Sequence, residues 1–104
     1  MRRTRLALPA LLLAILLAPS GAGASSDAAW AEMRKTVEAA CLKAASGHFA
    51  RATALVDPFG SERFGLALLR GPAKGGGGRS VQMICVYDKR AGTVELGSEL
   101  PVAP

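Results

Sequence analysis

The stretch Ser80-Val81-Gln82-Met83-Ile84-Cys85-Val86-Tyr87-Asp88 decides the fold of this chain. Its side chains alternate between two faces, and this period of two predicts a β-strand from Ser80 to Asp88. One face carries Val81, Met83, Cys85 and Tyr87, and the other carries Gln82, Ile84, Val86 and Asp88. Cys85 therefore lies on an apolar strand face.

A helix precedes this strand in the chain. The pattern predicts a helix from about Asp27 to Ser46, with Asp27 as its N-cap and Gly47 as a left-handed residue just beyond its end. Apolar residues recur at helical spacing and form one stripe: Trp30, Met33, Val37, Cys41 and Ala44. Cys41 is thus on the face that we expect to be buried.

The two cysteines of the chain, Cys41 and Cys85, are predicted to form one structural disulfide. Such a bond would join the apolar stripe of the helix to the apolar face of the strand, so two independent periodicities agree with the pairing. The alternative is a redox-active or metal-binding pair. That alternative lacks a CxxC spacing and a histidine near either cysteine.

The remaining elements are expected to complete an antiparallel sheet. Three further strands are predicted over Ala50–Val56, Glu62–Arg70 and Thr93–Leu96. Turns are expected over Asp57–Gly60 and Lys89–Gly92, a flexible linker over Lys74–Arg79 with its four consecutive glycines, and a frayed tail over Gly97–Pro104. The predicted fold is α+β, with one N-terminal helix packed on a three- to four-stranded antiparallel sheet and one disulfide.

Residues 1–24 have the layout of a cleavable signal peptide. Arg2, Arg3 and Arg5 form a basic start, an apolar stretch follows over Leu6–Ala18, and Ala22-Gly23-Ala24 offers a small-x-small cleavage pattern. The alternative is an uncleaved anchor, but 13 apolar residues fall short of the roughly 20 that span a bilayer. The expected domain is 25–96, in the periplasm or secreted, and it meets the membrane only through the signal peptide.

Charge argues against nucleic-acid binding. The chain has 13 Lys and Arg against 8 Asp and Glu, but the three arginines of the signal peptide account for much of this excess. Residues 25–104 keep 10 basic and 8 acidic side chains, a net charge of +2. A nucleic-acid-binding domain needs a clustered basic stripe, so we expect no nucleic acid among the partners.

The stretch Val86-Tyr87-Asp88-Lys89-Arg90-Ala91-Gly92-Thr93-Val94-Glu95 contains an aspartate, a short turn, a glycine and a β-branched residue in succession. In this order of residues, the stretch resembles the PepSY-type modules of bacterial cell envelopes. The similarity in architecture extends over Ala31–Leu96, while the cysteine pair and the glycine-rich connection depart from the family pattern. The resemblance implies a binding or inhibitory role in the envelope and transfers no catalytic residue.

The sequence offers few groups for chemistry. His48 is the only histidine, and no nucleophile with an orienting acid can be placed beside it. The glycine run feeds a strand instead of a helix N-terminus, which a phosphate-binding loop requires. Lys74 and Arg79 are expected at the opposite end of the sheet from Lys89 and Arg90. We therefore predict no catalytic residue, no metal site and no cofactor.

Apolar residues on the second sheet face are the best candidates for a functional surface. Leu69, Ile84, Val86 and Val94 are predicted to lie opposite the helix, where one helix cannot cover them. The alternative is that Ala50–Phe59 folds over them. The favoured hypothesis is a non-enzymatic exported binding or inhibitory module that contacts an envelope protein or a second copy of itself. The second hypothesis is a small periplasmic enzyme that uses His48 or a redox-active cysteine pair.

Overall fold

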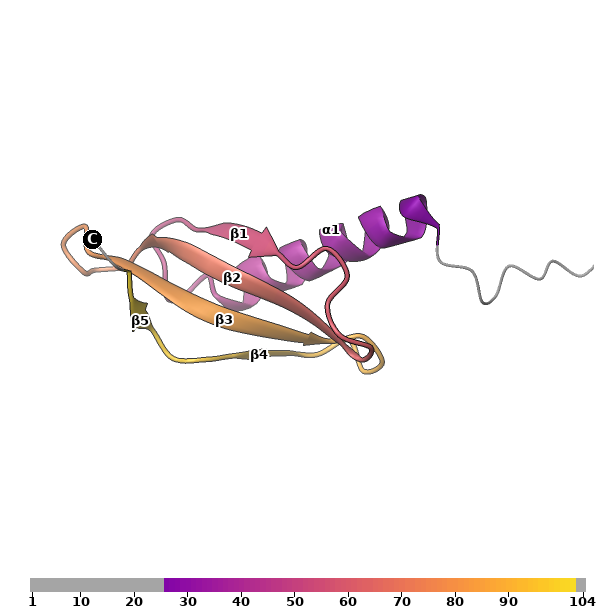
Figure 1. Cartoon of the computed structure of the whole chain (residues 1–104). Coiled ribbons are helices and arrows are strands. Elements are labelled where there is room, and N and C mark those ends of the chain that lie inside the picture. Colours follow the sequence, from indigo (N-terminus) through magenta and orange to yellow (C-terminus); the bar gives the residue numbers. More distant parts are fainter. Residues whose placement is uncertain (1–25, 103–104) are drawn as a thin grey trace, which may run out of the picture.

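The computed structural model describes residues 26–102, so the predicted signal peptide lies outside the described residues. One helix packs on one face of an antiparallel sheet, which confirms the predicted α+β fold (Figure 1). The elements are α1 (Asp27–Ala44), β1 (Thr53–Val56), β2 (Phe64–Pro72), β3 (Ser80–Asp88), β4 (Val94–Leu96) and β5 (Leu100–Pro101). Among residues 26–102, no helix combines the length and hydropathy that crossing a membrane requires.

The sheet is built around the long hairpin of β2 and β3. These strands pair over nine residues, from Phe64 opposite Asp88 to Pro72 opposite Ser80. β1 lies beside β2, while β4 and β5 share the free side of β3. The prediction of a frayed tail is wrong for Leu100–Pro101, because these residues form β5, which pairs with β3 as a fifth strand. The two added ladder positions satisfy backbone groups of β3 that would otherwise be open.

The glycine-rich connection closes the β2–β3 hairpin and is not an unstructured linker. The N–H of Ala73 donates to the carbonyl of Arg79 (2.8 Å), and the N–H of Arg79 donates to that of Gly76 (3.2 Å). Gly75, Gly77 and Gly78 have positive φ. Glycine is the residue that adopts this conformation without steric cost, so the glycines serve the loop geometry.

Helix α1 begins at the predicted residue, Asp27, but its N-cap is one residue earlier than predicted and it ends two residues before Ser46. Ser26 is the N-cap, since its side chain accepts the N–H of Ala29 at 3.1 Å. Asp27 lies in the first turn, where its negative charge interacts favourably with the helix dipole. The helix ends at Ala44 and Ala45 is its C-cap. Gly47 has no positive φ, so the predicted left-handed end is wrong.

The core lies between α1 and the inner face of the sheet, by which we mean the face toward the helix. Cys41 and Cys85 form the predicted disulfide, with a Cα–Cα distance of 6.0 Å and both residues fully buried. Closing a loop of 44 residues stabilises the fold by about 4 kcal/mol in the chain-entropy model. The buried hydrophobic residues are Val37, Cys41, Ala45, Phe49, Ala67, Leu69, Ala73, Val81, Met83 and Cys85. Ala45 takes the place on the stripe that was predicted for Ala44, which is exposed.

Small residues on β2 allow the helix to lie close to the sheet. Gly65 lies directly against Val37, and a Cβ atom added to Gly65 would overlap the Val37 side chain. Ala67, two residues on, is also buried beneath the helix. Leu66 and Leu68 alternate with these two positions. They consequently lie on the opposite side of the sheet, which we call the outer face.

Candidate binding surface

Five apolar side chains gather on the outer face. Strand register places them in two cross-strand rows, because positions that pair across a sheet share a face. The first row is Leu55, Leu68 and Ile84, and the second is Leu66 and Val86. Leu55 is 73% exposed and Ile84 49%, whereas the other three are half-buried by their neighbours.

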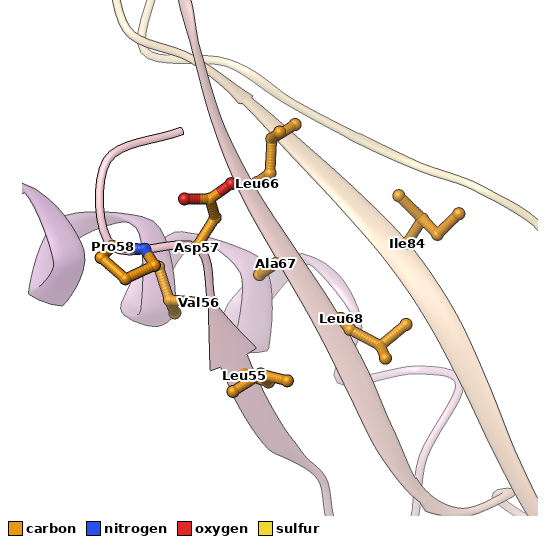
Figure 2. A pocket seen from close by; sticks show the side chains of 8 residues that line it. All are labelled: Leu55, Val56, Asp57, Pro58, Leu66, Ala67, Leu68 and Ile84. Atoms are coloured by element: carbon orange, nitrogen blue, oxygen red, sulfur yellow. The ribbon is translucent and has the colours of Figure 1, made fainter. Parts of the chain in front are cut away.

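An open groove of about 430 Å³ lies along these rows. Figure 2 shows Leu66 and Leu68 projecting from β2, with Ile84 on one side of them and Leu55 on the other. Asp57 and Pro58, which follow β1 directly, border the groove beside Leu66. Contiguous exposed apolar surface on a small domain is typical of a contact site for another molecule.

The carboxylate of Asp57 is held in place at one end of the groove. Its Oδ1 accepts the backbone N–H groups of Gly60 (3.0 Å) and Phe59 (3.1 Å). These two bonds stabilise the ionised form and lower the pKa of Asp57. Glu95 pairs with Val86 in the ladder and so lies on the outer face in the same region. We call Asp57 and Glu95 the acidic end of the outer face.

Basic side chains lie at the other end. Arg70 follows Leu68 by two residues on the same face, and its guanidinium donates to the side-chain oxygen of Gln82 at 3.4 Å. Arg70 also lines a shallow hollow together with Leu55 and Leu68. A neighbouring hollow is lined by both Arg51 and Arg70. We call these two arginines the basic end. Asp57 and Glu95, at the acidic end, flank the row of Leu66 and Val86.

An ion pair lies beyond the acidic end, where the β2–β3 ladder ends. The guanidinium of Arg63 donates to Oδ2 of Asp88 at 2.8 Å, and the Arg63 charge lies 5.5 Å from the centre of the Phe64 ring. The bond from Arg63, together with the backbone N–H groups of Ala91 and Arg90, lowers the pKa of Asp88 to about 2. The two charges offset each other and add little to the net charge of this region.

Lys89, in the turn between β3 and β4, contacts residues near the start of α1. The ammonium of Lys89 donates to the carbonyls of Phe59 and Ser61, both at 2.9 Å. It also lies 5.3 Å from the centre of the Trp30 ring. Trp30 and Phe59 pack edge to face, with ring centres 5.0 Å apart. Phe59 thus packs on the helix and leaves the outer face open.

Two of the four residues predicted for this surface lie elsewhere. Ile84 and Val86 are on the outer face, but Leu69 is fully buried beneath the helix. Val94 pairs with Tyr87, an inner-face residue, and packs against the core. The prediction missed Leu55, Leu66 and Leu68. The available signal was the pair of small residues Gly65 and Ala67, which marks the strand face that a helix can approach.

His48 lies away from the outer face, near β5. Its Nδ1 is 3.8 Å from Oε2 of Glu99, and the guanidinium of Arg79 is 3.9 Å from Oε1 of the same carboxylate. Within residues 26–102, no cluster of three or more metal-ligating side chains is found. Cys41 and Cys85 are joined, and this part of the chain holds no free thiol.

Comparisons of the chain with protein-family models, with curated proteins and with solved structures give no match. The candidate surface is therefore characterised by its own geometry: two apolar rows on the sheet, an open groove, and one charged end of each sign.

Proposed function

We propose that this protein is an exported binding domain that holds an apolar protein segment on the outer face of its sheet. The observation that carries the proposal is the ordered array of Leu55, Leu66, Leu68, Ile84 and Val86, which neither the helix nor the segment before β2 covers. A flat apolar surface on paired strands can bury a partner with little rearrangement of its own backbone.

The disulfide and the N-terminal sequence support the proposed compartment. A buried bond between Cys41 and Cys85 is compatible with an extracellular location, since such bonds persist in oxidising environments. Together with the signal-like residues 1–24, it supports export to the periplasm or beyond. The PepSY-like stretch Val86–Glu95 agrees with this role, because that family implies binding or inhibition in the envelope.

Peptide selection tests the proposed function. A display library of random peptides is selected on the protein expressed from its full chain and isolated from a bacterial periplasm, with the double variant Leu55→Ser/Ile84→Ser for counter-selection. We expect enriched peptides that are rich in large apolar residues and that bind the variant at least about tenfold more weakly. Peptides that bind both proteins equally, or no enrichment, would contradict the proposal.

A matched variant controls for general changes of the surface. Ala39→Ser and Ala44→Ser alter two exposed positions of α1, on the far side of the molecule. These changes should leave peptide binding unchanged. Circular dichroism of each variant before selection shows whether the fold is retained.

A further inference from the structure

We propose that the outer face binds a second copy of this chain, stacked face to face about a two-fold axis that runs between the two sheets and perpendicular to their strands. This inference rests on the proposed function and names its partner. Its basis is the placement of charge around the apolar rows, which makes the face complementary to itself.

The charged side chains at the two ends of the face form no salt bridge among residues 26–102. The ion pairs among residues 26–102 join His48 to Glu99, Arg63 to Asp88, and Arg79 to Glu99. None of them includes the basic end (Arg51 and Arg70) or the acidic end (Asp57 and Glu95). Asp57 accepts hydrogen bonds only from the backbone N–H groups of Gly60 and Phe59, which lower its pKa most. The charge of Lys89 lowers this pKa further, but Lys89 forms no salt bridge with Asp57.

The direction of the axis follows from these charges. A two-fold axis perpendicular to the strands reverses strand direction, and the basic end of each copy then lies over the acidic end of the other. An axis parallel to the strands would place like charges together, which is repulsive. In the first arrangement, the row of Leu55, Leu68 and Ile84 of one copy packs on the same row of the other. The basic end of each copy then lies over the partner's row that contains Asp57 and Glu95. Each contact occurs twice, as in any isologous dimer.

The size of the face sets the strength of the contact. Four strand positions at about 4.8 Å and seven residues at about 3.3 Å give a footprint of about 20 by 23 Å. This area is below the roughly 800 Å² per partner of a standard stable interface. We therefore expect a weak, reversible dimer that forms at high local concentration.

Sedimentation velocity measures this association directly. The protein isolated from the periplasm is studied from about 5 μM to about 500 μM, a range that suits an interface of this size. We expect the average mass to rise from one copy toward two copies as concentration increases. A constant monomer mass over the whole range would overturn the proposal.

Charge reversal tests the arrangement of the two copies. Arg51→Glu/Arg70→Glu makes both ends of the face acidic, and Asp57→Asn/Glu95→Lys removes the acidic end and leaves both ends basic. Asparagine at position 57 keeps the side-chain oxygen that accepts the N–H groups of Phe59 and Gly60. Each variant alone should associate at least about tenfold more weakly than the wild type.

Mixing the two variants provides the decisive comparison. In the mixed pair, each acidic end meets a basic end, so association should return to within about threefold of the wild-type value. The control variant Lys35→Glu/Lys43→Glu makes on α1 the same change in net charge as Arg51→Glu/Arg70→Glu makes on the outer face. This control should dimerise as the wild type does. This arrangement would be refuted if either charge-reversal variant alone dimerised as strongly as the wild type, or if the mixture of the two variants stayed monomeric.

The outcomes also separate this inference from the proposed function. If the wild type stays monomeric but apolar peptides still bind it through Leu55 and Ile84, the second copy is wrong and the binding function stands. If neither peptides nor a second copy bind the outer face, both proposals fail.

Discussion

Val37 of helix α1 lies so close to Gly65 of strand β2 that a Cβ atom on Gly65 would overlap the valine side chain. This contact determines which face of the sheet the helix covers. It brings the small residues of β2 inward, and therefore leaves the leucines at positions 66 and 68 on the outer face.

Replacing Gly65 by alanine should destabilise the domain. The added methyl group meets Val37, and overpacking of this kind costs about 1–3 kcal/mol. Chemical denaturation measures the change, and Val37→Ala in the same chain should restore part of the loss. Gly47→Ala is the matched control, since open space surrounds that position. Equal stability of the Gly65 and Gly47 variants would show that the helix does not pack as described.

Leucines on the two sheet faces should respond differently to the same substitution. Leu69→Ala removes a fully buried side chain and should cost about 2–5 kcal/mol. Leu55→Ala changes a side chain that is 73% exposed, so we expect a change within about 0.5 kcal/mol. Urea unfolding curves of the two variants give the comparison. A large loss for Leu55→Ala would mean that the outer face is part of the core.

The disulfide should supply a large share of the stability. Cys41→Ala/Cys85→Ala opens a loop of 44 residues, and we expect the free energy of unfolding to fall by about 4 kcal/mol or more. Unfolding of the wild type with and without reductant is the companion measurement. If reduction leaves the midpoint unchanged, the bond contributes nothing to the fold.

Acid should weaken the domain through Asp88. Its pKa in the folded protein is about 2, below the ordinary value of 3.8, so the ionised form stabilises the folded state. The contribution is complete at pH values well above 3.8 and is lost as the pH falls from there toward 2. The variant Asp88→Asn should lack this component, while Asp57 still titrates in both proteins. Unfolding curves of identical pH dependence in the two proteins would exclude the effect.

Periodicity was sufficient to predict the elements that carry strong alternation. β3 has the predicted bounds, and the pairing of Cys41 with Cys85 followed from two independent patterns. β5 could not be predicted from the sequence, because a strand of two residues is too short to show alternation and one of the two is a proline, which is uncommon within strands. Its position depends on the open edge of β3, which is a tertiary feature.

The candidate surface was harder to predict because both faces of β2 are apolar. Phe64, Leu66 and Leu68 alternate with Gly65, Ala67 and Leu69, and bulk alone favours the first set as the core. The helix instead selects the face with the smaller residues. Val94 was misplaced for a different reason: a shift of one residue in the pairing of a three-residue strand reverses every side chain.

Site-specific photo-crosslinking in living cells tests the central claim most directly, that the outer face is a protein-binding surface. A photoreactive side chain replaces Ile84 in one variant and Lys43, an exposed residue of α1, in another. Both variants are produced as the full chain in an exporting bacterial host. We expect a covalent adduct from position 84 and none from position 43, with a mass of two copies if the partner is this chain. Adducts of equal yield from both positions, or none from position 84, would contradict the claim.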